Sequence, residues 1–332
     1  MGEIRGANGR IIDYVRISVT DRCNYRCLYC MPESGVRSVT HDNIMRYEDI
    51  TFLCLVLSEL GVRKVRFTGG EPLVRKGFVS FLIDFKKSFP DIAVSLTTNA
   101  SLLAKYAPFL SDAGLYSMNI SLDTLDREKF KKITRIGEID DVREGIMAAK
   151  RAGIERIKSN TVLIRGFNDT ELPDILGYAW DNGITPRFIE FMPLDCGLWR
   201  REDFLGARDA LKLLEGLFGK WNLMEDSARY KNDDKKIPLG PAKYYSNEDG
   251  RVVGIIEAVS NHFCSVCNRL RVTASGGLRA CLFAAEEARL LDMLRNKDAG
   301  SVKRAILDSA AAKPECWRDS LKGGVEMSGV GG

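Results

Sequence analysis

The chain has 332 residues, of which 45% are hydrophobic and 28% charged, a balance that excludes a largely disordered protein. Its net charge is only +4, and Lys and Arg form no block of five or six, so a nucleic-acid-binding arm is not indicated. No apolar run approaches the length of a membrane span, and the first residues lack the apolar core of a signal peptide. We therefore expect a cytoplasmic protein with neither nucleic acid nor a membrane as its partner.

Short β-like runs alternate with helical stretches over the first 190 or so residues. The expected strands are Tyr14–Val19, Val65–Thr68, Ile92–Thr97, Tyr116–Leu122, Arg156–Leu163 and Arg187–Phe191. The expected helices, four of which stop at a glycine, are Tyr47–Leu60, Phe78–Lys87, Leu102–Ala113, Asp140–Ala152 and Glu171–Asn182.

These six strand–helix units predict an α/β fold with a parallel sheet and right-handed crossovers. A closed eight-stranded barrel takes about 250 residues, which is more than this region offers. We therefore predict an open, TIM-like partial (β/α)6 barrel. A doubly wound open sheet is the alternative, which periodicity alone does not exclude. Polar residues follow several of the expected strands, and barrel enzymes place their sites at those carboxyl ends.

The regular alternation of expected strands and helices ends after Phe191, where a smaller C-terminal α+β region is expected. We place the domain boundary near residue 200, with residues 1–200 in the barrel and 201–332 in the second region. The second region contains an expected helix over 207–218, a polar stretch over 231–240, a hairpin of 244–246 and 252–258, and helices near 286–294 and 302–311.

Six of the nine cysteines form two groups of three, and Cys54, Cys196 and Cys316 stand alone. The first group, Cys23, Cys27 and Cys30, follows the first expected strand. Thiolates hold iron–sulfur clusters, and three on one tight loop would leave the fourth iron of a cubane open for chemistry. A zinc knuckle with a borrowed ligand is the alternative, although the spacing differs from the usual paired CxxC pattern. Cys54 lies in the apolar run FLCLVL and is expected in the core.

The second group, Cys264, Cys267 and Cys281, again offers three thiolates. A structural zinc site would want a fourth ligand, for which His262 is the candidate. An iron–sulfur cluster is the other interpretation.

Arginines cluster around this second group, and their forked guanidiniums suit a phosphate-bearing ligand. They are Arg269, Arg271 and Arg279, and Arg16, Arg66 and Lys158 add positive charge near the expected strand ends. Such a concentration of cations is costly without a paired anion. No G-x4-GK[ST] loop is present, so a nucleotide would be remodelled and not hydrolysed.

The segment ISVTDRCNYRCLYCMP resembles the signature of radical S-adenosylmethionine (SAM) enzymes. From Asp13 to Gly332 the chain resembles the GTP 3′,8-cyclase family of molybdenum cofactor biosynthesis. The resemblance includes RFTGGEPLVR, the Lys158-x-Asn160 strand, RFIEFMP, the second cysteine group and the terminal glycines. Each segment is moderately specific, and their common order is highly specific.

The resemblance implies a partial barrel of the radical SAM type that binds SAM, GTP and two [4Fe–4S] clusters. Cys23, Cys27 and Cys30 are the implied catalytic residues, since they would hold the cluster that cleaves SAM. Cys264, Cys267 and Cys281 would hold the second cluster, whose open iron would bind the substrate. The implied SAM contacts are Tyr29, Gly70, Ser121 and Met192. The implied GTP contacts are Arg16, Arg66, Thr98, Lys158, Arg269 and Arg271.

In this family a radical derived from SAM takes hydrogen from the ribose C3′ of GTP, and the resulting carbon radical attacks C8 of guanine. The implied product is (8S)-3′,8-cyclo-7,8-dihydroguanosine 5′-triphosphate, which cyclic pyranopterin monophosphate synthase would rearrange as a downstream partner. A reducing electron donor and a homodimer are further family-level expectations. The tail Gly331–Gly332 is expected to reach into the active site.

The segment Pro314–Trp317 departs from the family, whose members tend to carry histidine there, and the 231–240 stretch is longer than a minimal connection. Neither falls on an expected ligand position. Two other functions remain open. One is another radical SAM enzyme with an auxiliary cluster, although these usually carry more than three cysteines in the second group. The other is a zinc-stabilised nucleic-acid-binding module, which the dispersed charge argues against.

Overall fold

The computed structural model describes residues 2–35, 40–194, 200–225 and 240–320. Six parallel strands form the centre of its sheet and pair in the order of the sequence. They are β1 (Tyr14–Ser18), β2 (Lys64–Thr68), β3 (Ala93–Thr98), β4 (Ser117–Ser121), β5 (Ile157–Leu163) and β6 (Thr185–Glu190). This sequential order is that of a barrel, whereas a doubly wound sheet reverses direction at a switch point. The predicted partial barrel is confirmed.

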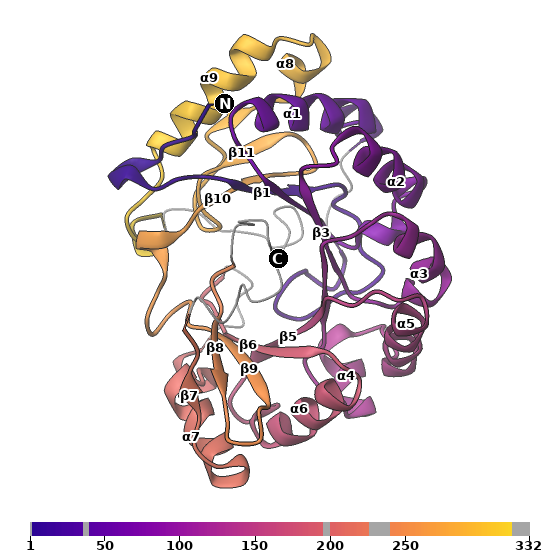
Figure 1. The fold of residues 1–332 in the computed structure, drawn as a ribbon, viewed down its shortest axis with the longest axis vertical. Coiled ribbons are helices and arrows are strands. Elements are labelled where there is room, and N and C mark those ends of the chain that lie inside the picture. Colours follow the sequence, from indigo (N-terminus) through magenta and orange to yellow (C-terminus); the bar gives the residue numbers. More distant parts are fainter. Residues whose placement is uncertain (1, 36–39, 195–199, 226–239, 321–332) are drawn as a thin grey trace.

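Helices cover the outer face of the curved sheet, as Figure 1 shows. They are α1 (Tyr47–Glu59), α2 (Phe78–Ser88), α3 (Leu103–Asp112), α4 (Arg127–Thr134), α5 (Ile139–Arg151) and α6 (Leu172–Asp181). All but α4 were predicted; this short helix begins at Asp126, whose carboxylate accepts a hydrogen bond from the Lys129 N–H. Alternation along β2 turns Phe67 toward the helices, where its ring meets that of Phe85 at 5.2 Å, and leaves Arg66 on the concave face.

The C-terminal region extends both edges of this sheet. On one edge β10 (Arg269–Val272) pairs in parallel with β1, followed by β11 (Gly277–Arg279) and β12 (Ala288–Arg289). On the other edge β9 (Val252–Ile256) pairs in parallel with β6, followed by β8 (Lys243–Ser246) and β7 (Asn222–Leu223). The twelve strands of the described chain form one open sheet. The division near residue 200 stays a prediction.

Among the C-terminal elements, the hairpin of β8 and β9 agrees with its prediction, as does α7 (Ala207–Phe218). The helix expected over 286–294 is wrong at its start, because residues 288–289 pair with β11 and α8 spans only Leu291–Arg295. The last long helix is α9 (Ala299–Ala311). Most of the polar stretch, Cys196 and the terminal glycines lie outside the described residues. None of the helices in the described ranges combines the length and the apolar character needed to cross a membrane.

Candidate active site

A cavity of about 500 Å³ lies on the concave face of the sheet, and the six cysteines of the two groups of three line it. The first group follows β1 and therefore lies at the carboxyl ends of the strands. Cys264 and Cys267 precede β10, which runs parallel to β1, and Cys281 follows β11, which runs antiparallel to β10, so the second group lies at the amino ends. The site thus spans the length of the barrel, whereas the sequence had indicated the carboxyl ends alone.

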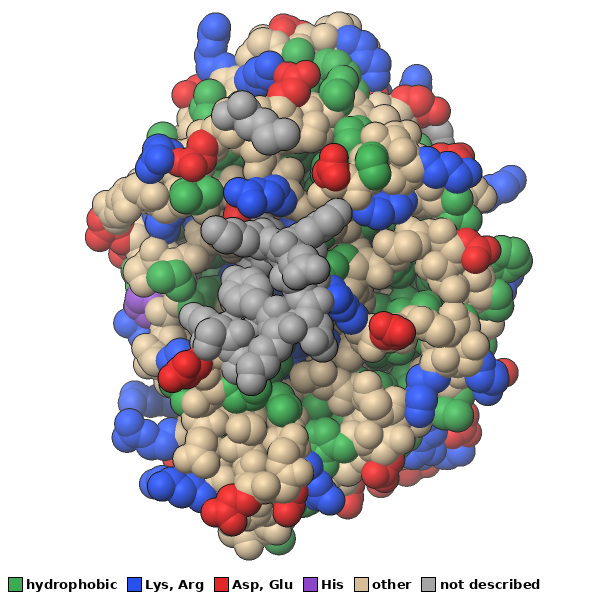
Figure 2. Space-filling view, viewed as in Figure 1, with side chains coloured by type: hydrophobic (Ala, Val, Ile, Leu, Met, Phe, Trp, Pro, Cys, Tyr) green, Lys and Arg blue, Asp and Glu red, His purple; other side chains and the backbone are tan. Residues whose placement is uncertain are grey.

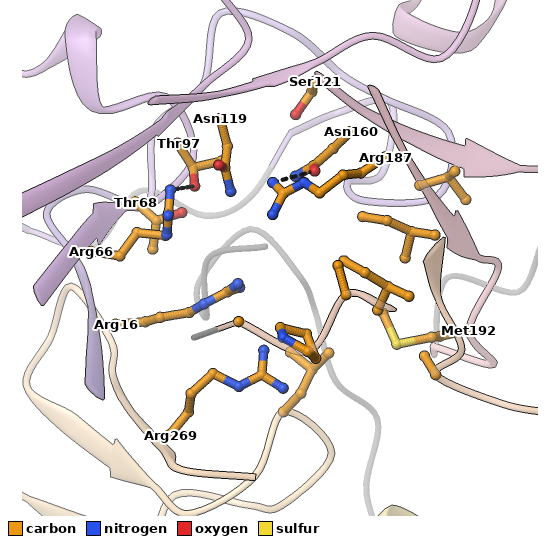
Figure 3. A pocket seen from close by; sticks show the side chains of 18 of the residues that line it. Arg16, Arg66, Thr68, Thr97, Asn119, Ser121, Asn160, Arg187, Met192 and Arg269 are labelled. Carbon is orange, nitrogen blue, oxygen red and sulfur yellow. Dashed lines mark hydrogen bonds between the residues drawn. The ribbon is translucent and has the colours of Figure 1, made fainter. Parts of the chain in front are cut away.

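Positive charge dominates the described lining of this cavity (Figure 3). The cationic residues of that lining are Arg16, Lys64, Arg66, Lys158, Arg187, Arg269, Arg271 and Lys313. Asp123 is the single carboxylate among the described lining residues, and it accepts hydrogen bonds from the Tyr29 hydroxyl at 2.5 Å and the Val162 N–H at 2.8 Å. Buried cations need paired anions, so the cavity fits a ligand with several negative charges.

The loop that carries the first cysteines is held by bonds to its backbone. Arg135 on the loop after α4 donates from Nη1 to the carbonyls of Arg26 at 2.7 Å and Met31 at 2.9 Å. The Cys30 N–H donates to the Cys27 carbonyl at 3.0 Å, which makes a tight turn between these two thiols. A fixed backbone with three thiols that line a cavity is the arrangement that a bound cluster requires.

The segment Gly69–Pro72 passes directly beneath this loop. A Cβ on Gly70 would lie 2.2 Å from the Arg22 carbonyl oxygen, so only glycine allows this close approach. The buried Glu71 carboxylate then joins two strand ends, because it accepts hydrogen bonds from the Thr98 hydroxyl at 2.8 Å and the Asn99 N–H at 2.7 Å. Burial raises the pKa of Glu71 to about 7.

The two cysteine groups differ in their electrostatic surroundings. Burial raises the pKa of the Cys23 thiol to about 11, and nearby Glu71 adds to this shift. Burial also raises the pKa of Cys27 well above 9, with the charges of Cys30 and Asp123 acting in the same direction. These thiols therefore lack a positive neighbour sufficient to make them thiolates, which a bound cationic metal centre would supply.

The second group has cations beside it. Burial opposes ionisation of Cys267, but the positive charges of Arg269 and Lys313 outweigh it and lower the pKa of this thiol to about 6. Lys313 is itself fixed by donating from Nζ to the carbonyl oxygens of Arg269, at 2.8 Å, and Ala280. Arg10 adds a second brace, donating to the Cys264 carbonyl oxygen at 2.8 Å.

The cations between the two groups are held by the barrel to different degrees. Arg66 donates from Nε to the Tyr14 hydroxyl at 2.7 Å and from Nη1 to the Leu96 carbonyl at 2.9 Å. Arg187 donates from Nη2 to the Asn160 side-chain oxygen at 2.6 Å, while its buried Nε has no partner among the described residues. The buried Arg16 Nε likewise has no protein partner among the described residues. Unpaired donors of this kind point to a ligand that accepts from them.

Two family matches divide the chain: the Radical SAM superfamily covers residues 17–179, and Molybdenum Cofactor Synthesis C covers residues 184–318. The chain is 43% identical over 309 residues to the GTP 3′,8-cyclase of Peptoclostridium acidaminophilum, covering 92% of this chain and 90% of that protein. It is 39% identical to the GTP 3′,8-cyclase of Thermodesulfovibrio yellowstonii, covering 97% of this chain and 98% of that protein. The chain belongs to the GTP 3′,8-cyclase family.

Solved structures agree on the fold of this family member. Streptococcus suis SuiB has a TM-score of 0.60 at 14% identity, with 86% of this chain matched to 66% of that chain. The structure of anSMEcpe with bound AdoMet and a peptide has a TM-score of 0.54 at 17% identity, with 86% of this chain matched to 79% of that one. At these identities the likeness concerns the radical SAM fold alone.

Membership in this radical SAM family brings SAM and a [4Fe–4S] cluster as cofactors. The residues fit both groups at the carboxyl end of the cavity. Three half-buried thiols on one fixed loop line the cavity, and Gly69 and Gly70 line it beside them. Burial raises the pKa of Cys23 and Cys27, and a bound metal centre with positive charge would offset this effect.

Every predicted site residue lines the cavity, although the hydroxyl of Thr98 is already committed to Glu71. Gly70, Ser121 and Met192 lie toward the carboxyl end with Tyr29, whose hydroxyl bonds Asp123. Their ligand contacts stay predictions. Arg279 differs from the other two arginines of its segment, because it is absent from the described lining and lies 3.9 Å from Glu286.

Five lining residues that lie beside the predicted cations were not expected from the sequence: Tyr14, Lys64, Arg187, Tyr244 and Lys313. Strand alternation carries a signal for two of them, since Tyr14 precedes Arg16 by two positions and Lys64 precedes Arg66 by two. Arg187 lay within the family motif RFIEFMP, but no role was assigned to it.

The unassigned Cys316 lies beside the second cysteine group. Its Sγ is 3.4 Å from His262 Nε2, and it packs in an apolar cluster with Cys264, Cys281 and Trp317. His262, the candidate zinc ligand, thus contacts Cys316, and its buried Nδ1 has no partner among the described residues. No group of three His, Cys, Asp or Glu side chains in the described chain is placed to hold a single metal ion.

Proposed function

We propose that this protein is a GTP 3′,8-cyclase that converts GTP to (8S)-3′,8-cyclo-7,8-dihydroguanosine 5′-triphosphate, the first step of molybdenum cofactor biosynthesis. One observation carries the proposal: a cavity lined by eight described cations and one described carboxylate lies between two cysteine triads. A nucleoside triphosphate supplies the missing negative charge. The named relatives at 43% and 39% identity support the same activity.

At the carboxyl end, Cys23, Cys27 and Cys30 would hold the cluster that binds SAM. The bound cluster and SAM together supply one electron and a hydrogen-abstracting radical. The chain's own part is placement: Gly70 lets the backbone approach the SAM amino group, while Tyr29, Ser121 and Met192 border the rest of the cofactor. Asp123 and Glu71 add negative character on this side, which suits the positive sulfonium of SAM.

At the amino end, Cys264, Cys267 and Cys281 would hold a second [4Fe–4S] cluster whose open iron orients the guanine. Arg269 and Arg271, together with Arg16, Arg66, Lys158 and Thr98, would bind the ribose and phosphates. Lys64 and Arg187 extend this set. The unpartnered Arg16 and Arg187 donors supply ready hydrogen bonds for phosphate oxygens.

The arrangement orients the two reactants along one axis. The cofactor is placed at one end and the nucleotide base at the other, so the ribose lies between them, where C3′ can meet the radical. Fixing reactants in this way converts a random encounter into a directed one, worth up to about 7–11 kcal/mol of barrier in favourable cases. The buried cavity also keeps water away from reactive carbon radicals.

Other parts of the proposal concern partners. A reducing electron donor must reach the first cluster, and cyclic pyranopterin monophosphate synthase would consume the product. We also propose that the protein works in the cytoplasm and assembles as a homodimer.

The test is anaerobic iron and sulfide analysis of reconstituted protein, followed by incubation with SAM, a reductant and GTP. The proposal expects about eight irons per chain, because two four-iron clusters are present. It also expects GTP-dependent 5′-deoxyadenosine and a cyclised guanosine product. Eight irons without turnover of GTP would retain the assignment as a radical SAM enzyme but would require another substrate. Zinc with little iron would overturn the proposal and favour a binding module.

A further inference from the structure

Tyr14 occupies a central place among the cations of the cavity. It lies on β1 between β2 and β10, in register with Lys64 on one side and Arg269 on the other. Its side chain is only 2% exposed, and it belongs to the lining of the cavity. The buried phenol of Tyr14 therefore has a cationic residue as its register partner on both neighbouring strands.

The contacts of Tyr14 bring three positive groups to one hydroxyl and one ring. The Arg66 Nε donates to the Tyr14 hydroxyl at 2.7 Å. Arg16 also hydrogen-bonds Tyr14, and the Lys64 ammonium lies 5.2 Å from the centre of its ring. The phenol oxygen therefore accepts from cations, which is the arrangement that stabilises a negative charge on it.

The other acidic groups near these cations are engaged elsewhere. Asp13, the neighbour of Tyr14 in sequence, accepts from the Asn268 amide at 2.8 Å, and its charge also interacts with Arg63 and Lys64. Asp123 bonds Tyr29 near the first cysteine group, and Cys267 pairs with Arg269 at the amino end. On the far side, the Tyr244 hydroxyl bonds both Lys158 and Arg187. Among the described residues, Tyr14 is thus the acidic side chain that faces Arg16, Lys64 and Arg66 together.

We propose that Tyr14 is a positioning residue that acts as the protein's own counter-charge in the cavity when no substrate is bound. Its ionised phenol balances Arg16, Lys64 and Arg66 and holds the Arg66 guanidinium in place. When the phosphates of the substrate arrive, they take over this balance and the phenol takes up a proton. Binding of a triphosphate is thereby coupled to proton uptake. The identity of that anion as GTP rests on the proposed function.

The pKa of Tyr14 supports this geometry. Burial alone would raise the pKa of the phenol, but the charges of Arg66, Arg16 and Lys64 outweigh burial and hold the pKa well below 10. Phosphate next to the phenol would reverse the effect, because a like charge raises the pKa of an acid. Between the lower free-state pKa and the higher bound-state pKa, each binding event takes up a proton. Affinity for the triphosphate therefore falls as the pH rises through this window.

Lys64 is the other group that can titrate here. Burial lowers the pKa of its ammonium to about 7, with Arg66 and Lys158 adding to the shift while Tyr14 opposes it. Phosphate binding would therefore also return a proton to Lys64. Tyr14→Phe separates the two groups, because this variant keeps Lys64. Tyr116, whose ring lies 5.0 Å from the Lys64 ammonium on the side away from β1, offers the matched control for loss of a phenol near Lys64.

The experiment is anaerobic calorimetry of the holoenzyme with GTP at pH 8 in buffers of different ionisation enthalpy, which yields the number of protons taken up. Wild-type protein is expected to take up protons, and Tyr14→Phe to take up fewer, by as much as about one per chain. Tyr116→Phe should match wild type. Equal uptake by wild type and Tyr14→Phe would overturn the proposal.

A second measurement needs no substitution. In holoenzyme carrying tyrosine labelled with ¹³C at Cζ, one resonance of ionised phenol is expected in the free protein and should disappear on binding. Inorganic triphosphate serves as a second probe in both measurements. Triphosphate-dependent loss of the signal without GTP binding would overturn the proposed function and keep the counter-charge role. Phenols that are all neutral in the free protein would overturn the counter-charge role whatever GTP does.

Discussion

The two ends of the cavity carry the same three thiols but opposite surroundings. At the carboxyl end, burial raises the pKa of Cys23 to about 11, and Glu71 adds to this shift while Arg26 opposes it. Asp123 acts in the same direction as burial on Cys27. At the amino end, burial is outweighed by Arg269 and Lys313, and the pKa of Cys267 falls to about 6. The same ligand chemistry therefore meets a mildly negative environment at one end and a strongly positive one at the other.

This difference in charge matches the charges of the two expected ligands, SAM and GTP. SAM carries a positive sulfonium, and GTP carries the charge of three phosphates. The opposite charges at the two ends favour binding of each ligand at its own end of the cavity. Binding of either ligand at the other end would bring like charges together. The barrel achieves this by adding β10 and its cysteines to the amino end of a fold whose parallel strands already present a site at the carboxyl end.

The largest effect is expected from removing one ligand of the first triad. Cys27→Ser should lower the iron content by about four per chain and reduce 5′-deoxyadenosine formation to background, because a cubane held by two thiolates is lost. Iron analysis and product chromatography measure both quantities. Cys54→Ala is the matched control, since Cys54 is fully buried in the core and should leave the iron unchanged. Full iron in Cys27→Ser would contradict the assignment of this triad.

Gly70→Ala should separate the two ends. The added Cβ would lie 2.2 Å from the Arg22 carbonyl oxygen and push the first cysteine loop away from β2. We expect SAM affinity to fall by about 100-fold, which corresponds to roughly 3 kcal/mol, while binding of GTP changes little. Gly177→Ala is the control, because nothing lies within 4 Å of its added Cβ. Equal losses for both ligands would show that the two ends are not independent.

Arg269→Met tests the amino end. Removing a charge-assisted donor should weaken GTP about 10- to 100-fold, because hydrogen bonds to charged groups contribute about 1.5–3 kcal/mol. SAM binding should stay as in wild type. Arg279→Met is the control, since Arg279 lies on the neighbouring strand next to Glu286 and outside the described lining. Calorimetry measures the affinity of each variant for GTP and for SAM. A larger loss of affinity for SAM than for GTP would reverse the assignment of the two ends.

The smallest effect is expected from Tyr29→Phe. Loss of the hydroxyl removes the 2.5 Å bond to Asp123 and leaves that buried carboxylate with the Val162 N–H as its backbone donor in the described part of the chain. The KM for SAM should rise by no more than about tenfold, consistent with one hydrogen bond. Phe85→Leu, a change in the apolar core where the Phe85 ring packs against Phe67, controls for general loosening. An unchanged KM would make the Tyr29 hydroxyl dispensable.

Much of this site was predictable from local patterns. Alternating strands and helices predicted the partial barrel, and the cysteine spacing and family motifs predicted which residues line the cavity. Those signals are contiguous in sequence. Residues such as Cys23 and Gly70 are therefore predictable from the sequence alone.

The remainder depends on pairing between distant segments. That β10 adds next to β1 places Arg269 beside Tyr14, and no local pattern connects residues 255 positions apart. The same pairing puts the second triad at the amino ends, where the sequence had not indicated a site. Residues 288–289 were predicted as helix for a similar reason. This two-residue edge strand forms because it pairs with β11, and two residues are too few to show the alternating pattern of a strand.

The most direct test of two opposite ends uses a pair of single-cluster variants, Cys27→Ser and Cys281→Ser. Each is reduced anaerobically and titrated with SAM and with GTP, and the remaining cluster is followed by electron paramagnetic resonance. We predict that the cluster left in Cys281→Ser responds to SAM alone and that the cluster left in Cys27→Ser responds to GTP alone. A cluster at the amino end that responds to SAM, or one at the carboxyl end that responds to GTP, would contradict the account.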